Sequence, residues 1–247
     1  MSDAPYDAVL CDFDGVLRLW DPDGMSALDR GAGLAEGTLA SAAFRPELLD
    51  AAVTGRISDE QWRRRVAEDL ADACGSLDRA LDLVSGWSAL SGRVDTAVLE
   101  VLTEIRSRVP VVLVSNATTR LEADLTTLGL ADAFDAVVNT ARIGVAKPDH
   151  RVFEAAAQTV GVAPRRCLFV DDTPGHVAAA RAAGLTGLHY THVDQLRSAT
   201  APPKPEPGNG TTDSSASPGP EMSMPTESGS HSRALSVSHG CVPPAVR

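Results

Sequence analysis

The 247-residue chain has 22 basic and 33 acidic residues, a formal charge of −11, and 43% hydrophobic residues. This composition is ordinary for a globular protein with a sizeable core. The excess of acid argues against nucleic acid as the main partner, because phosphate backbones attract basic faces. The first residues have neither a basic start nor a long apolar run, and no apolar stretch is long enough to span a membrane, so we expect a cytoplasmic protein without a membrane partner.

The first expected element lies in the stretch from Tyr6 to Leu17. Residues 8–11 form a short apolar run without helical periodicity, which predicts a strand buried on both faces. Asp12 and Asp14 follow at once, and in an extended chain two residues at this spacing point the same way. Gly15 then ends the strand. Such a strand tip suits a cation or a phosphate, although paired aspartates at a strand end also commonly do no more than begin a turn.

Residues 17–93 contain no further strand pattern and predict an inserted α-helical segment. Ser58–Gln61 have the pattern of a capping box, and Trp62 begins the apolar face of the helix that follows. We expect Trp62 to pack in the core of this segment. The basic run Arg63–Arg65 is expected to lie on a solvated face.

From Pro110 onward, strand patterns alternate with helix patterns. The predicted strands are Val111–Val114, Ala136–Val138, Cys167–Val170 and Leu188–Tyr190, and helices are predicted near residues 119–128, 149–160 and 174–183. Regular alternation of this kind is typical of a parallel sheet with helices on both faces. We therefore predict an α/β fold: a three-layer, Rossmann-like core built from residues 1–16 and 94–200, with the helical segment inserted at 17–93.

Residues 201–247 have a different composition. They hold nine of the sixteen prolines, many Ser, Thr and Gly residues and no aromatic residue. Such a segment cannot bury enough apolar surface to offset the entropy of an ordered chain, so we expect a disordered tail.

Polar side chains follow the predicted strands where ligands bind in such sheets, beyond the carboxyl ends. Ser115 and Asn116 follow the second strand, as Asp12 and Asp14 follow the first, and Asp171 and Asp172 follow a later one. Lys147 is one of only two lysines in the chain and lies in a loop between a strand and a helix. Carboxylates hold Mg²⁺ together with waters and a substrate phosphate, and a hydroxyl, backbone N–H groups and an ammonium complete a phosphate cradle.

Four motifs in this order resemble those of the haloacid dehalogenase-like superfamily of hydrolases, in the branch with a helical cap inserted after the first motif. The resemblance covers roughly residues 6–197 and rests on D-F-D-G-V, V-S-N, G-V-A-K-P-D and V-D-D-T-P-G-H-V-A-A-A-R-A-A-G. It implies a Mg²⁺-dependent phosphatase that acts on a small phosphorylated metabolite.

The resemblance also implies roles for the site residues. Asp12 would attack phosphorus and form an aspartyl-phosphate, and Asp14 would protonate the leaving alcohol and later accept a proton from water. Ser115 and Lys147 would hold the phosphoryl oxygens, with Gly15 and Asn116 also at the phosphate. Mg²⁺ would be bound by Asp12, the backbone carbonyl of Asp14, and Asp172.

The fourth motif departs from that of many relatives. Asp171 stands where they have Gly, and His176 stands where they have a second Asp. We assign Asp172 to the metal and Asp171 to a supporting position behind it. His176 is not expected to be a ligand, because a lone His near a helix start is more often a surface or hydrogen-bonding residue.

Several functions share this scaffold, so the site has to decide among them. Asp14 argues against a dehalogenase, because a halide leaving group needs no proton. The phosphonate hydrolase of the superfamily needs a lysine in the cap, and residues 17–93 contain none. A phosphomutase remains open, and a non-catalytic binding module remains a weaker alternative. Arg18 and Trp20 could face the crevice and contact substrate. Neither the natural substrate nor the oligomeric state can be derived from the sequence.

Overall fold

The computed structural model describes residues 6–201, and it forms an α/β fold around a five-stranded parallel sheet with the strand order β5-β4-β1-β6-β7. The strands are β1 (Ala8–Cys11), β4 (Val111–Ser115), β5 (Ala136–Asn139), β6 (Cys167–Asp171) and β7 (Thr186–His189). The predicted parallel sheet is thus confirmed, with β1 in the middle position. The part of the predicted tail from residue 202 onward lies outside the described residues.

The three central strands are buried along their whole length, which explains why their sequences are nearly continuous apolar runs. Successive side chains of a strand point to opposite faces of its sheet. In β1, Val9 and Cys11 join one apolar cluster, whereas Ala8 and Leu10 join another on the opposite face. The short strand β1 therefore contributes to both halves of the core.

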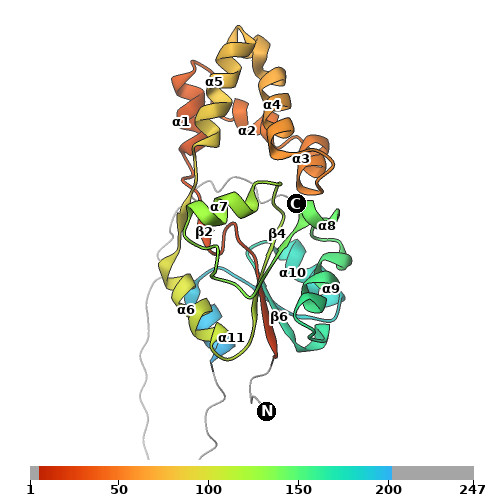
Figure 1. The fold of residues 1–247 in the computed structure, drawn as a ribbon. Helices are drawn as coiled ribbons and strands as arrows, with labels where there is room; N and C mark the ends of the chain where they lie inside the picture. Colours follow the sequence, from red (N-terminus) through yellow and green to blue (C-terminus); the bar gives the residue numbers. More distant parts are fainter. Residues whose placement is uncertain (1–5, 202–247) are drawn as a thin grey trace, which may run out of the picture.

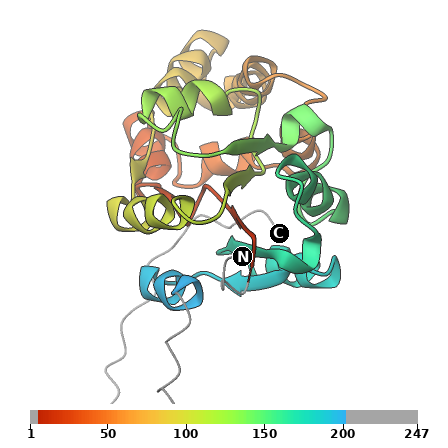
Figure 2. The same cartoon turned by 60° about the horizontal axis from the view of Figure 1, so that its bottom comes forward.

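Helices cover both faces of the sheet. One face is covered by α6 (Thr96–Arg106), α7 (Leu121–Thr127) and α11 (Val193–Thr200). The other is covered by α9 (His150–Thr159) and α10 (Pro174–Ala182). Both views show α6 and α11 on one side of the sheet and α9 on the other (Figures 1 and 2). This is the three-layer arrangement that the alternating pattern predicts.

A helical segment interrupts the α/β core and has its own apolar centre. Its helices are α1 (Gly24–Gly31), α2 (Thr38–Ala43), α3 (Pro46–Val53), α4 (Asp59–Cys74) and α5 (Leu77–Ser88), and we call residues 24–88 the helical insert. The capping box of Ser58 and Gln61 is present at the start of α4. Trp62 is 5% exposed and lies edge-to-face against Trp87 with ring centroids 4.9 Å apart, so its expected packing role is confirmed.

A two-stranded antiparallel ribbon connects the helical insert to the core. Its strands, β2 (Arg18–Leu19) and β3 (Arg93–Val94), carry the chain out of the core and back. The insert lies over the end of the sheet where α7 and α8 (Thr140–Ile143) are placed (Figure 1). It contacts the core at Gly55, where a Cβ atom would lie 2.0 Å from the carbonyl oxygen of Ala141.

Some elements differ from the prediction, mainly where sequence signals are weak. Strand β7 begins at Thr186, two residues before the expected start, because its register is set by β6, with Thr186 opposite Leu168. Helices α8 and α11 were not predicted. Helix α8 is a single four-residue turn, and α11 is fixed by packing of Leu196 in the cluster beneath α6. No helix within residues 6–201 has both the length and the apolar character that a membrane crossing requires.

Candidate active site

Polar residues at the carboxyl ends of three adjacent strands form one buried cluster. Asp12 directly follows β1, Ser115 ends β4, and Asp171 ends β6, and these three strands lie side by side in the sheet. The three residues are 6%, 1% and 0% exposed, respectively. The parallel sheet therefore brings together residues that are more than 50 positions apart in the chain.

Lys147 lies at the centre of this cluster and is 4% exposed. Its Nζ lies 2.8 Å from Oδ1 of Asp12 and 2.8 Å from Oδ2 of Asp171, and it donates to the carbonyl oxygen of Val114 at 3.1 Å. An ammonium has three N–H donors, so all of them have partners. Burial opposes the charge of Lys147, but the Asp12 and Asp171 carboxylates outweigh it and raise the pKa of the lysine. Lys147 is therefore positively charged in the site.

Asn116 holds the Lys147 loop in place. Its Nδ2 donates to the carbonyl oxygen of Lys147 at 2.9 Å, and its Oδ1 accepts the backbone N–H of Lys147 at 2.8 Å. Both ends of the side-chain amide are thus used on the backbone of one residue. The sequence had suggested Asn116 for phosphate binding, whereas its hydrogen bonds fix the position of the lysine.

Asp171 is enclosed by donors. In addition to Lys147, its carboxylate accepts the backbone N–H of Thr173 at 2.8 Å, and Nδ1 of His176 lies 3.1 Å from Oδ2. Burial alone would raise the pKa of Asp171, but Lys147 and His176 hold it well below its usual range. The supporting position behind the metal that the sequence suggests for Asp171 stays a prediction.

His176 is buried rather than on the surface, at 6% exposed. It lies in the first turn of α10, which begins at Pro174, and this turn faces the end of β6. Nε2 of His176 is buried and has no hydrogen-bond partner among residues 6–201. The hydrogen-bonding role considered for this histidine is thus present, and its proximity to a strand end is the signal that could have indicated burial.

Asp12 is not neutralised to the same degree as Asp171. Its Oδ1 accepts the backbone N–H of Phe13 at 2.7 Å as well as facing Lys147. Burial raises the pKa of Asp12 well above its usual value, and the Lys147 charge only partly opposes this. The negative charges of Asp171 and Asp14 act in the same direction as burial. A further positive charge would therefore stabilise Asp12 as a carboxylate.

Asp172 lies against the turn that follows β1. A Cβ atom on Gly15, whose φ is +82°, would lie 2.1 Å from Oδ2 of Asp172, so any other residue at this position would have to displace the carboxylate. Burial, followed by the charge of Asp171, raises the pKa of Asp172. Asp12 and Asp172 lie beside the same turn. In both, the nearby positive charge is too small to offset the effect of burial and of the neighbouring carboxylates on the pKa.

This donor set fits a hard divalent cation, which prefers oxygen ligands. One group of three possible ligands in the described part of the chain, Asp12, Asp171 and His176, has donor atoms within 4.8 Å of one another. Lys147 already lies 2.8 Å from the two carboxylates of that group, so a cation there would meet a positive charge. The metal pair expected from the sequence, Asp12 and Asp172, stays a prediction.

Asp14 lies beyond the end of β1, where it forms an isolated β-bridge with Arg18 across the turn of residues 15–17. The carbonyl oxygen of Phe13 accepts the backbone N–H groups of Leu17 and Arg18 at 2.9 and 2.8 Å, so the extended-chain argument for Asp12 and Asp14 does not describe their geometry. The Asp14 side chain is 39% exposed and is ion-paired with Arg18. This pair is not predicted by the sequence, because a four-residue spacing of opposite charges indicates an ion pair only on a helix, and residues 14–18 are not helical.

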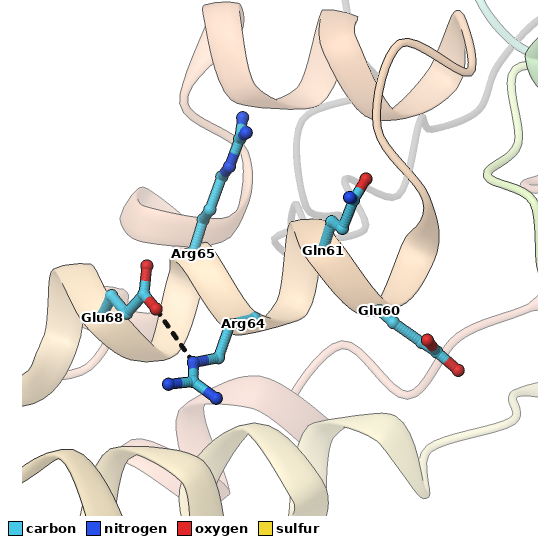
Figure 3. Close-up of a pocket in the computed structure, with 5 residues that line it drawn as sticks. All are labelled: Glu60, Gln61, Arg64, Arg65 and Glu68. Carbon is cyan, nitrogen blue, oxygen red and sulfur yellow. Dashed lines mark hydrogen bonds and ion pairs between the residues drawn. The ribbon is translucent and has the colours of Figure 1, made fainter.

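The surface of α4 outside this cluster has a depression lined by charged and polar side chains (Figure 3). Its lining residues are Glu60, Gln61, Arg64, Arg65 and Glu68. Arg64 and Arg65 are exposed, as predicted, and Arg64 is paired with Glu68 at 2.9 Å. The prediction for Arg63 was wrong, because its guanidinium packs over the ring of Trp87 and pairs with Asp59 at 2.7 Å.

Comparisons with known proteins agree with this architecture. The family model for haloacid dehalogenase-like hydrolases matches residues 6–184. A phosphoserine phosphatase of Thermus thermophilus is 32% identical over 139 residues, which cover 54% of this chain and 55% of that protein. A phosphatase of Mycobacterium tuberculosis is 43% identical over 68 residues, covering 28% of this chain and 31% of that protein. The chain thus spans about half or less of the length of these curated relatives.

A solved structure shows the same fold. It is a HAD family enzyme of Bacteroides thetaiotaomicron in complex with magnesium and inorganic phosphate. The likeness has a TM-score of 0.61 at 20% sequence identity and covers 74% of this chain and 93% of that chain.

Proposed function

Since the chain belongs to the haloacid dehalogenase-like hydrolases, we propose that it is a Mg²⁺-dependent phosphatase of a small phosphorylated metabolite. The observation that carries this proposal is the pairing of buried Asp12 with the Lys147 ammonium at the carboxyl end of the central strand. Asp14, two residues later, supplies a second carboxylate. Phosphatase activity in two partial relatives and a magnesium and phosphate complex in a protein of the same fold support it.

Asp12 is suited to act as the nucleophile through one oxygen. Oδ1 is engaged by Phe13 N–H and Lys147, whereas Oδ2 has no hydrogen-bond partner among residues 6–201. In the first step, Oδ2 attacks phosphorus, the bond from phosphorus to the ester oxygen breaks, and Asp14 gives its proton to the leaving oxygen. In the second step, water attacks the phosphorus of the aspartyl-phosphate and Asp14 takes a proton from that water. The bond between phosphorus and Asp12 Oδ2 breaks, which releases inorganic phosphate and restores the Asp12 carboxylate.

In this proposal, Mg²⁺ would be held by Asp12, the backbone carbonyl of Asp14 and Asp172, and it would supply positive charge beside the phosphoryl oxygens. Ser115 and the backbone near Gly15 would bind the phosphoryl group. Lys147 has used all three N–H donors on protein oxygens, so it acts mainly through its charge. A direct hydrogen bond from Lys147 to phosphate requires one of those contacts to be exchanged.

The helical insert serves as a cap in this proposal, within the predicted bounds 17–93. Its contact with the core includes Asp59, whose Oδ1 accepts the hydroxyl of Thr118 at 2.8 Å in the loop after β4. This places the start of α4 beside a loop that also carries Asn116. A cap at this place excludes water while the phosphoryl group moves.

A phosphomutase uses the same pair of carboxylates, so it is the second candidate function. A dehalogenase is disfavoured by Asp14, which a halide leaving group does not need. A binding module is disfavoured by the buried carboxylate of Asp12, whose Oδ2 has no hydrogen-bond partner among residues 6–201.

The first experiment measures phosphate release from 4-nitrophenyl phosphate. Activity is expected with Mg²⁺, and little or none is expected with a chelator or in Asp12→Asn. Asp194→Asn, at a carboxylate 72% exposed, controls for simple loss of charge. Equal rates under all conditions contradict the mechanism. A mutase would instead be identified with a sugar phosphate as substrate, by formation of the isomerised sugar phosphate with little free phosphate.

A further inference from the structure

The carboxylate of Asp14 is held by three donors from two side chains. Arg18 donates from Nε to Oδ1 at 2.6 Å and from Nη2 to Oδ2 at 3.0 Å. The indole Nε1 of Trp20 donates to Oδ1 at 2.8 Å. The proton-transfer residue of the proposed reaction is therefore fixed by a forked ion pair and one further hydrogen bond.

Arg18 is itself fixed on every side. Its side chain is 7% exposed, and its guanidinium carbon lies 4.3 Å from the ring centroid of Phe13 and 4.5 Å from that of Trp20. Its third arm, Nη1, donates to Oδ2 of Asp124 at 3.0 Å. Burial opposes the charge of Arg18, but Asp14 and Asp124 outweigh it and raise the pKa of the guanidinium. A charged group held in this way has little freedom to leave Asp14.

The donors leave the two oxygens of Asp14 unequal. A carboxylate has about four lone-pair sites, two on each oxygen. Oδ1 receives Arg18 Nε and Trp20 Nε1 and is full, whereas Oδ2 receives only Arg18 Nη2. Within residues 6–201, one lone pair on Oδ2 has no partner. The Asp14 side chain as a whole is 39% exposed.

We propose that Arg18 and Trp20 are positioning residues that orient Asp14 so that Oδ2 is the oxygen that exchanges the proton. This inference rests on the proposed phosphatase function. Asp14 enters the first step with a proton on the free lone pair of Oδ2. That O–H bond breaks, the proton goes to the leaving alcohol oxygen, and the carboxylate that remains is the form paired with Arg18. In the second, the same lone pair takes a proton from the attacking water. Arg18 and Trp20 keep their hydrogen bonds throughout and do not touch the phosphoryl group.

Proton donation by Asp14 matters only for leaving groups that need a proton. Benzyl phosphate releases an alkoxide unless it is protonated, whereas 4-nitrophenyl phosphate releases a stable phenolate. The two compounds have rings of similar size. The ratio kcat/KM reports only steps up to the first irreversible one, which is formation of the aspartyl-phosphate, so it isolates the step in which Asp14 acts as an acid.

The test compares kcat/KM for both substrates in wild type, Arg18→Met and a control. Methionine keeps an apolar stem between Phe13 and Trp20 but has no donor. The matched control is Arg120→Met, because Arg120 pairs with the same Asp124 at 2.8 Å without a hydrogen bond to Asp14. We expect Arg18→Met to lower kcat/KM about 100-fold for benzyl phosphate. For 4-nitrophenyl phosphate the loss is expected to be below about threefold, and Arg120→Met should leave the ratio between substrates unchanged.

Two further variants make the result independent of how well Arg18→Met folds. Trp20→Phe removes one donor at a residue 38% exposed and is expected to shift the ratio in the same direction by a smaller factor. Arg18→Lys keeps the charge with a single donor group and is expected to fall between wild type and Arg18→Met. Equal losses on both substrates in Arg18→Met and Trp20→Phe overturn the inference. Absence of turnover by wild type overturns the proposed function instead.

Discussion

Gly15 and Asp172 are packed so closely that a Cβ atom on residue 15 would lie 2.1 Å from the Asp172 carboxylate oxygen Oδ2. Gly15→Ala is therefore expected to displace Asp172 and to lower kcat at least 100-fold, since small displacements of reacting groups are costly. The positive φ of +82° adds about 1–2 kcal/mol of strain. Gly161→Ala is the matched control, because its φ is +67° and nothing lies near its Cβ position. Both variants should lose stability in urea unfolding, and only Gly15→Ala should lose activity; equal activities contradict the assignment.

Asn116→Asp tests the loop that carries Lys147. The carboxylate can still accept the Lys147 N–H, but it replaces the donor to the Lys147 carbonyl with a second acceptor. We expect a loss of about 1–3 kcal/mol in the free energy of unfolding, together with reduced kcat. Asn139→Asp serves for comparison, because that amide likewise joins two backbone groups, those of Thr118 and Ala141. Its loss should be confined to stability, and a normal kcat in Asn116→Asp would count against the positioning role.

Asp172 and Asp171 should respond in opposite ways to removal of their charge. The pKa of Asp172 is raised by burial and by Asp171, so its ionised form is unfavourable in the folded protein above the unfolded pKa. In the presence of a chelator, Asp172→Asn is expected to raise Tm by roughly 2–4 °C. Asp171→Asn should lower Tm, because Asp171 is ion-paired with Lys147 and bonded to Thr173.

The effect of Mg²⁺ on Tm tests whether Asp172 binds the metal. We expect added Mg²⁺ to raise the Tm of wild type by mass action and to have no such effect on Asp172→Asn. Differential scanning fluorimetry over a Mg²⁺ titration measures both. An unchanged Mg²⁺ response in Asp172→Asn would remove Asp172 from the proposed ligand set.

Asp135 predicts a pH dependence that is independent of the active site. Its carboxylate accepts the backbone N–H of Val111 at 2.8 Å and Arg106 Nε at 3.0 Å. Burial opposes ionisation, but these donors lower the pKa of Asp135 below its usual value. The stabilisation is thus present above the unfolded pKa of about 4 and is lost as the pH falls through the folded value. Asp135→Asn should cost about 1–2 kcal/mol at pH 7 and progressively less below about pH 4.

Urea unfolding at several pH values measures this difference. Asp132→Asn, at an exposed carboxylate nearby, is expected to leave the wild-type profile unchanged. A difference between Asp135→Asn and wild type that stays constant with pH would contradict the assignment.

The sequence predicted most of what depends on short-range patterns. The strands β1, β4 and β6 are buried apolar runs, and their ends could be located within a residue because a polar residue comes directly after each run: Asp12 follows β1, Ser115 is the last residue of β4, and Asp171 is the last residue of β6. Parallel pairing then dictates that these ends meet. The Ser58 capping box and the core position of Trp62 are likewise local or periodic signals.

What the sequence could not provide depends on contacts between distant segments. Asn116 has the same amide whether it binds phosphate or the Lys147 backbone, and only the folded loop decides. Arg63 was expected in solvent because its neighbours are, but Trp87, 24 positions later, covers it. The edge strand β7 has a weak pattern of its own, and its register comes from β6.

The ribbon of β2 and β3 has a consequence for how such a protein can diversify. Leu19 and Arg93 face each other across the ribbon, so the chain leaves and re-enters the core at neighbouring points. The sheet therefore constrains neither the length nor the shape of what lies between them. A segment joined in this way can be lengthened, shortened or exchanged for another while Asp12, Lys147 and Asp171 keep their places, so selectivity can evolve separately from the chemistry.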